Sequence, residues 1–200
     1  MTVSSVVSNF ELLVKPIVQP RADILGVGRT VIQGYFLSIS NLSSRDDFRI
    51  QLNFRAQNPD LTQTNLLAFW DVNGNNALQT PTVNAPDSLV YELRIMPRDT
   101  GLFILQPNVA NEQVVNNANT EVRGYLEVSL ADPFGGQTFN LLLSPEHRGT
   151  FLPKNFVIPN NPSATRPQDF DQLVYSLPTA KGGTEFEFKQ LSPEFAVIAP

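Results

Sequence analysis

Residues 48–55 read Phe-Arg-Ile-Gln-Leu-Asn-Phe-Arg, with apolar and polar side chains in strict alternation. Successive side chains of a strand point to opposite faces, so Phe48, Ile50, Leu52 and Phe54 share one face. This pattern is typical of an antiparallel sheet that packs one face on a core and turns the other to water. Similar alternation recurs at 89–95 and 185–189. Because no segment shows a convincing helical period, the sequence predicts an all-β protein.

Residues 64–72 are more continuously apolar and contain Leu66, Leu67, Phe69 and Trp70. A strand that is apolar on both sides is expected in the middle of a sheet. Asn73-Gly74 follows directly, and both residues tolerate the positive φ that a two-residue hairpin turn requires. The sequence therefore predicts a hairpin at this point.

The chain also contains two similar halves, which cover residues 29–106 and 120–190. In each half a Gly-Tyr strand is followed by a strand that begins with Phe, then by a Leu-Val-Tyr-x-Leu segment, a proline, a turn and a final strand. The matched segments start at Gly34 and Gly124, at Phe48 and Phe139, and at Leu89 and Leu173. Because the order is kept, we expect two tandem or pseudo-symmetric antiparallel β-sandwich units of about five strands each. The alternative is one larger ten-stranded sandwich.

The remaining segments set the predicted boundaries of these units. Residues 1–28 contain Pro16 and Pro20 and are interpreted as an N-terminal arm or edge strand. The Asn-rich stretch 107–119 is the predicted linker, and 153–169 form a long proline-rich loop. Residues 191–200 form a C-terminal tail whose apolar part, 195–198, is expected to dock on its own domain or on a neighbouring subunit.

Composition narrows the range of functions. Two hundred residues can bury roughly 70 % of the surface of the unfolded chain, so the absence of cysteine leaves a core feasible without disulfides. A net charge of −5 disfavours nucleic-acid binding, which depends on clustered basic residues. Amide side chains are nearly as numerous as the charged ones that make up 16 % of the chain. Such a surface suits lateral packing in an assembly or hydrogen bonding to sugars, with ordinary Asn-rich loops as the plain alternative.

Targeting and membrane signals are not found in the sequence. The first residues lack the positive region of a signal peptide, and no run reaches the roughly 18 apolar residues of a membrane helix. We therefore expect a soluble protein with no membrane partner, most simply in the cytoplasm. A single histidine and the absence of cysteine make a transition-metal site improbable, and no cofactor is expected.

Residues around the predicted hairpin form the candidate ligand site. Trp70 is followed by Asp71, Asn73 and Asn75, and an aromatic platform beside amide and carboxylate groups is what a carbohydrate site needs. The competing interpretation places Trp70 in the core. The alternating oxygen side chains also suggest calcium, but the glycine and the distal glutamate of a helical calcium loop are missing, so no metal is predicted.

Catalytic patterns are weak. Ser144 and His147 lie in a segment interpreted as a turn, without the glycine pattern of a nucleophile elbow. Asp99-Thr100-Gly101 has the aspartic-protease triplet, but the second half has Lys181-Gly182-Gly183 at the equivalent turn. The carboxylate pairs Glu185/Glu187 and Asp169/Asp171 fit solvated strand faces as well as a glycosidase.

The prediction is therefore a non-catalytic structural or protein-interaction protein that belongs to a homo- or hetero-oligomeric assembly. Its expected partner is another protein, either a second copy or a different chain. A lectin-like carbohydrate-binding module at Trp70, Asp71, Asn73 and Asn75 is the alternative, and a hydrolase that uses Ser144 or Asp99 is a remote third.

Overall fold

A computed structural model describes residues 4–16, 28–152 and 170–192 of the chain. Strands dominate these residues, which confirms the all-β class. The strands are β1 (Ser4–Pro16), β2 (Thr30–Asn41), β3 (Phe48–Arg55), β4 (Leu66–Val72), β5 (Asn75–Gln79), β6 (Val83–Ala85), β7 (Ser88–Ile95), β8 (Thr100–Pro107), β9 (Thr120–Leu130), β10 (Thr138–Phe151), β11 (Asp171–Ser176) and β12 (Glu185–Lys189). A 3-10 turn (Leu61–Gln63) and helix α2 (Glu112–Asn117) complete the described elements.

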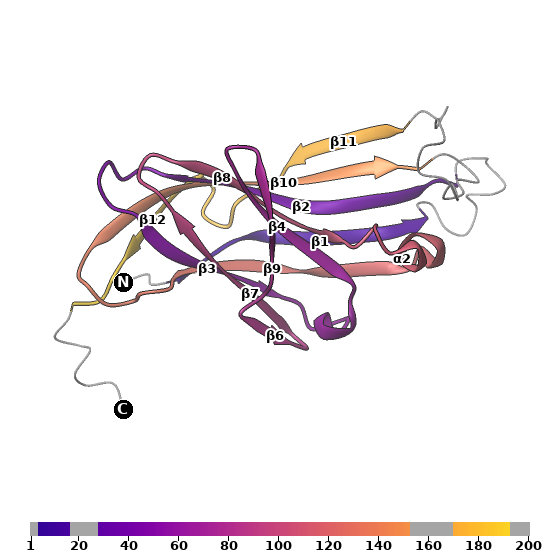
Figure 1. Cartoon of the computed structure of the whole chain (residues 1–200), viewed down its shortest axis with the longest axis horizontal. Coiled ribbons are helices and arrows are strands. Elements are labelled where there is room, and N and C mark those ends of the chain that lie inside the picture. The colour runs from indigo at the N-terminus through magenta and orange to yellow at the C-terminus, as the bar shows by residue number, and fades with distance from the viewer. Residues whose placement is uncertain (1–3, 17–27, 153–169, 193–200) are drawn as a thin grey trace.

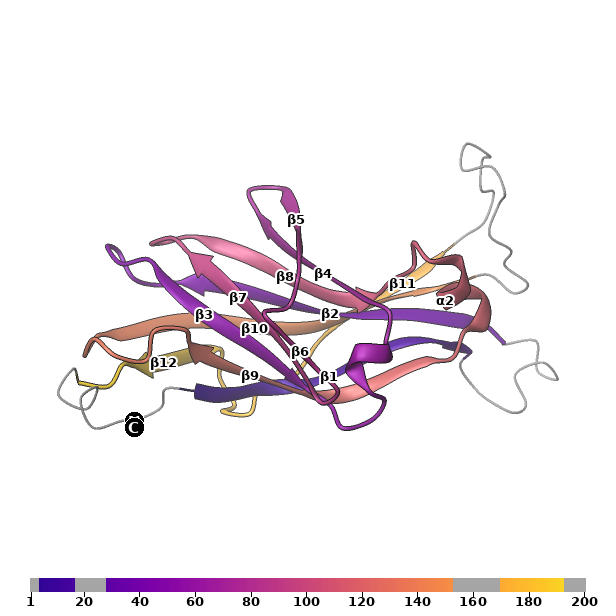
Figure 2. The same cartoon turned by 60° about the horizontal axis from the view of Figure 1, so that its bottom comes forward.

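The strands form one curled antiparallel sheet with the order β5-β4-β8-β2-β1-β9-β3-β7-β6. The branch point is β2. One edge of β2 pairs with β10 along nearly its whole length, and the other edge pairs first with β1 and then with β8. In turn, β10 carries β12 on its first part and β11 on its last part. Figures 1 and 2 show the resulting long, curled arrangement, with the β4–β5 hairpin projecting to one side.

Strands from the two predicted units are interleaved in this sheet. From the second half, β9 pairs with β1 and β3, and β10 pairs with β2. The residue match that suggested a duplication does not hold at its first segment, since Tyr35 is fully buried and Tyr125 is 42 % exposed. At the Leu-Val-Tyr segments the strand pairing agrees, because β3 pairs with β7 in the first half as β10 pairs with β11 in the second, but the burial differs, with Tyr91 3 % and Tyr175 39 % exposed.

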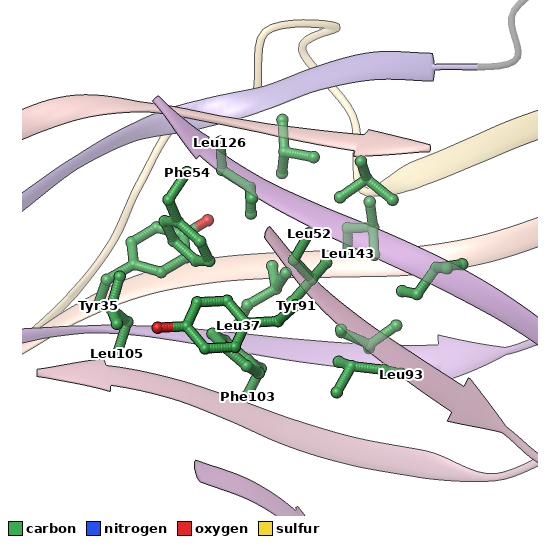
Figure 3. Close-up of a cluster of buried hydrophobic side chains, with 14 of the residues drawn as sticks. Tyr35, Leu37, Leu52, Phe54, Tyr91, Leu93, Phe103, Leu105, Leu126 and Leu143 are labelled. Carbon is green, nitrogen blue, oxygen red and sulfur yellow. The ribbon is translucent and has the colours of Figure 1, made fainter. Parts of the chain in front are cut away.

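One buried cluster draws side chains from both halves. At its centre Phe54 lies 5.3 Å from Phe10 and 5.7 Å from both Tyr35 and Phe103, measured between ring centroids. The aromatic contacts therefore connect β1, β2, β3 and β8. Figure 3 shows the side chains that gather in this region from six strands: Tyr35, Leu37, Leu52, Phe54, Tyr91, Leu93, Phe103, Leu105, Leu126 and Leu143.

Local predictions fared differently. The hairpin is confirmed, because Val72 pairs with Asn75 and the turn residues Asn73 and Gly74 have φ of 57° and 80°. The expectation of no helix is wrong at Glu112–Asn117, inside the predicted linker. Asn111 caps this helix by accepting a hydrogen bond from the backbone N–H of Gln113. None of its residues is buried, so the sequence shows no amphipathic period there.

The predicted N-terminal arm is a strand over Ser4–Pro16, and it pairs with β9 along most of its length. The rest of that arm (1–3 and 17–27), the proline-rich loop (153–169) and the apolar tail residues (195–198) lie outside the described residues. Helices long and apolar enough to cross a membrane are absent from the described part of the chain.

Candidate functional site: an apolar outer face

The outer face of the sheet carries a row of large apolar side chains across β5, β4, β8 and β2. Phe69 lies opposite Leu78 on one side and Ile104 on the other, and Ile104 lies opposite Phe36. Directly opposite residues of an antiparallel pair share a face, so these four side chains are neighbours. Leu78 is 63 % exposed and the other three are partly exposed. We call Leu78, Phe69, Ile104 and Phe36 the apolar row.

Both faces of β4 and β8 are apolar. Toward the core these strands present Ala68, Phe103 and Leu105, all nearly completely buried. Toward the outside they present Phe69 and Ile104 of the apolar row together with the partly exposed Leu102. The apolar run 64–72 predicts a strand that is apolar on both sides, and β4 does lie between β5 and β8. The prediction did not include that the second face of this strand is the surface of the molecule. The signal was present, since 66–70 and 102–105 are apolar in both phases.

The opposite outer face, on β3, β7 and β9, is polar. Arg49 pairs there with Glu92 at 3.0 Å and with Asp132 at 3.1 Å, and Arg94 pairs with Asp47. These ion pairs are well exposed and stabilise the fold little. The asymmetry between the two outer faces is what distinguishes the apolar row from scattered surface leucines.

A shallow groove of about 420 Å³ continues from the apolar row onto β10 and β11. Ile32, Phe36 and Val174 line it together with Arg148, whose guanidinium lies 4.6 Å from the ring centroid of Phe36. Arg148 also pairs with Glu146 at 3.0 Å, which neutralises its charge. The groove therefore offers apolar surface with one charged pair at its side.

The predicted carbohydrate residues are divided between the two faces of β4. Trp70 faces inward, packs against the core, and lies so close to Gly101 that a Cβ there would be 2.2 Å from the indole Cη2. Asp71 is the next residue and faces outward, where its Oδ1 is buried without a hydrogen-bond partner among the described residues. Asn73 and Asn75 are exposed in and beside the turn. Trp70 and Asp71 thus do not share a face.

His147 belongs to a polar network at the branch point of β2. Continuing the β1–β2 register would place Tyr35 opposite Glu11, but Tyr35 pairs with Leu105 of β8 instead. Two side chains make the hydrogen bonds to the Glu11 backbone that a paired strand would otherwise make. His147 Nε2 accepts from the Glu11 N–H at 2.9 Å, and Gln33 Nε2 donates to the Glu11 carbonyl at 3.3 Å.

The same network fixes the state of the imidazole. Since Nε2 is an acceptor, the ring proton is on Nδ1, which donates to the Tyr175 hydroxyl oxygen at 2.9 Å. Burial lowers the pKa of His147 below its ordinary value, and the Glu11 carboxylate opposes this shift. Burial likewise raises the pKa of Tyr175. The imidazole is therefore held neutral.

Residues 144–149, which the sequence analysis interpreted as a turn, lie inside β10. Alternation along this strand turns His147 inward and Ser144 outward, so the Ser-His pair of the hydrolase hypothesis is not assembled. The misleading residue was Pro145, which is tolerated because it lies where the neighbour of β10 changes from β12 to β11.

The other acidic candidates occupy structural or solvated positions. Asp99 accepts a hydrogen bond from the Thr100 N–H at 2.8 Å within its own turn. Glu185 and Glu187 are exposed on β12, and Asp171 pairs with Arg29. Asp169 lies outside the described residues. The described residues contain no group of three or more His, Asp or Glu side chains that could hold a metal ion.

Comparisons with known proteins found no match to this chain among family models, curated proteins or solved structures.

Proposed function

We propose that this protein is a non-catalytic structural or protein-interaction component of an oligomeric assembly, and that it docks through the apolar row. The observation that carries the proposal is the contrast between its two outer faces. Antiparallel sheets usually turn polar side chains to water, as β3, β7 and β9 do here through Arg49 and its partners. A contiguous apolar patch on the other face is the usual mark of a protein-binding surface.

The surface chemistry supports the same function. The fully buried centre of a protein interface is depleted in charge and enriched in aromatic residues. The apolar row contains two phenylalanines, Phe36 and Phe69, and no charged side chain. The low charge content of the chain reduces the repulsion between neighbouring copies.

Light scattering on a sizing column, over a concentration series, tests self-assembly directly. We expect a species heavier than the 22.2 kDa chain, with a proportion that rises with concentration. A 22.2 kDa monomer at every concentration would overturn self-assembly and leave only a hetero-partner.

A matched pair of variants tests the surface itself. Ile104→Lys places a charge in the middle of the apolar row, whereas Val90→Lys places the same charge on the polar outer face of β7. Since a buried unpaired charge is costly, Ile104→Lys should weaken self-association at least tenfold, or about 1.4 kcal/mol. Val90→Lys should leave it unchanged. Equal behaviour of the two variants, with similar melting temperatures, would refute docking through the apolar row.

A further inference from the structure

The strand β11 (Asp171–Ser176) has the properties of an open sheet edge. All six of its residues are exposed, and within the described residues it pairs with β10 alone. Figure 1 shows it as the outermost strand beside β10. Its side chains on the two faces include Leu173 and Tyr175 on one and Val174 on the other, which are 40 %, 39 % and 60 % exposed.

One hydrogen bond fixes which backbone groups of β11 point outward. The Leu177 N–H donates to the Pro145 carbonyl at 2.9 Å, which continues the register that joins Tyr175 to His147 and Leu173 to Gly149. In an antiparallel pair, hydrogen-bonded positions alternate with positions whose backbone groups point away. The N–H and C=O groups of Gln172, Val174 and Ser176 therefore point away from β10.

We propose that β11 pairs antiparallel with β11 of a second copy, around a two-fold axis at Val174. This inference rests on the proposed function, for which it names a second copy as the partner and β11 as the contact. In this register Val174 faces the partner's Val174, and Gln172 faces the partner's Ser176. These are the positions whose backbone groups are free to exchange hydrogen bonds. On the inner face, Leu173 lies opposite the partner's Tyr175.

The sequence of β11 favours a second copy as the occupant. Residues 172–176 carry no charge, so the two-fold brings no like charges together. Within 172–176 every side chain meets one of similar polarity, and an isologous contact requires such self-complementarity. Edges that avoid pairing are blocked by proline or charge, and β12 fits that description with Glu185, Glu187 and Lys189.

The other uncharged edge strands, β5 and β6, are less suited to pairing, and β6 has only three residues. Strand β5 reads Asn-Asn-Ala-Leu-Gln, and these residue types are mostly poor strand formers. Strand β11 instead contains Leu, Val and Tyr in succession. Pairing there would also extend the outer face through Val174, which lines the groove next to the apolar row.

Proline at position 174 is the sharpest test. The Val174 N–H makes no bond to β10, so Val174→Pro removes nothing from the sheet of one copy but deletes the central bonds of the dimer. We expect the dissociation constant, measured by sedimentation velocity, to rise at least tenfold. Val174→Thr keeps both the N–H and the branched side chain and should dimerise as the wild type does. Thermal melting checks that all three proteins are folded.

Cysteine crosslinking gives an independent readout, because the chain contains no cysteine. At the two-fold axis the Cα atoms of Val174 and the partner's Val174 would be about 5.5 Å apart, within the range of a disulfide. Under mild oxidation, Val174→Cys should therefore form covalent dimers, whereas Val83→Cys, at a 47 % exposed position of β6, should not.

The outcomes separate this inference from the proposed function. If Val174→Pro associates as strongly as Val174→Thr while Ile104→Lys does not associate, the edge pairing is wrong and the apolar row stands. If Ile104→Lys associates normally while Val174→Pro does not, docking through the apolar row is wrong and pairing through β11 stands. A wild-type protein that stays monomeric at all concentrations would overturn edge pairing and self-assembly together.

Discussion

Replacing His147 by leucine tests the explanation for the branch point of β2. In the wild type the Glu11 N–H donates to His147 Nε2 at 2.9 Å, at a position where β2 has left β1 for β8. Leucine fills similar space but accepts no hydrogen bond. The Glu11 N–H then lies between strands without an acceptor.

The size of the effect follows from that orphaned donor. A buried unsatisfied backbone N–H costs about 1–3 kcal/mol. The hydroxyl of Tyr175 also loses one partner, but it still donates to Gln33 Oε1 at 3.4 Å, and Tyr175 is 39 % exposed and can bond to water. For a chain of this length, 1 kcal/mol lowers the melting temperature by about 2–4 °C. We therefore expect His147→Leu to melt roughly 2–12 °C below the wild type.

Urea unfolding at pH 7.5 gives the corresponding free energies, with His147→Gln as the control. A glutamine side chain carries a carbonyl that can accept from Glu11, so its loss of stability should be clearly smaller. If His147→Leu were as stable as the wild type, a stabilising role for the hydrogen bond from the Glu11 N–H to the imidazole would be refuted.

The pH dependence supplies a second arm of the same test. Burial places the pKa of His147 in the folded protein below its ordinary value of 6.5. As the pH falls below about 6.5, the imidazole of the unfolded chain is protonated before that of the folded protein. The contribution of His147 to the free energy of unfolding is therefore fully present above that pH and declines below it. The free-energy difference between the wild type and His147→Gln should therefore shrink on acidification. A difference that stays constant from pH 7.5 to 5 would contradict this.

Three glycine positions give further predictions. Gly101→Ala would bring a Cβ within 2.2 Å of the Trp70 indole, so we expect a loss of about 1–3 kcal/mol in urea unfolding and a changed emission spectrum of the only tryptophan; unchanged values in both would show that the indole does not pack there. Gly74→Ala meets open space but has φ of +80°, so it should cost about 1 kcal/mol from backbone strain alone. Gly183→Ala, also in open space, should be neutral by the same measurement.

Sequence patterns within a few residues predicted the strands and turns that depend only on neighbouring residues. The alternation at 48–55 produced β3 with Ile50, Leu52 and Phe54 buried. The Asn73-Gly74 turn joins β4 to β5 because its two positive φ values are set by the residues themselves. Helix α2 is missed because it packs no side chain into the core and therefore leaves no periodic signal.

The candidate site could not be predicted in the same way. Knowing that Phe69 lies between Leu78 and Ile104 requires the registers of two separate strand pairs. Contacts of His147 are more remote still, since Glu11 is 136 residues away in the sequence. Nothing in the neighbourhood of Ser144 and His147 shows that one faces outward and the other inward, once Pro145 has been interpreted as a turn.

The two glycines that opened the matched halves show why residue similarity is a weak guide to equivalent positions in a sheet. At Gly34, on the outer face, a Cβ would lie 3.1 Å from the Cβ of Gln106. At Gly124, on the inner face, it would lie 2.0 Å from the carbonyl oxygen of Arg55. A shift of one residue moves every side chain of a strand to the other face, so the same Gly-Tyr pair can have its tyrosine buried in one strand and exposed in another. Strand pairing is the firmer basis for comparing the halves. The Gly-Tyr strand of the first half, β2, pairs with the Phe-led strand of the second, β10, and the Gly-Tyr strand of the second half, β9, pairs with the Phe-led strand of the first, β3.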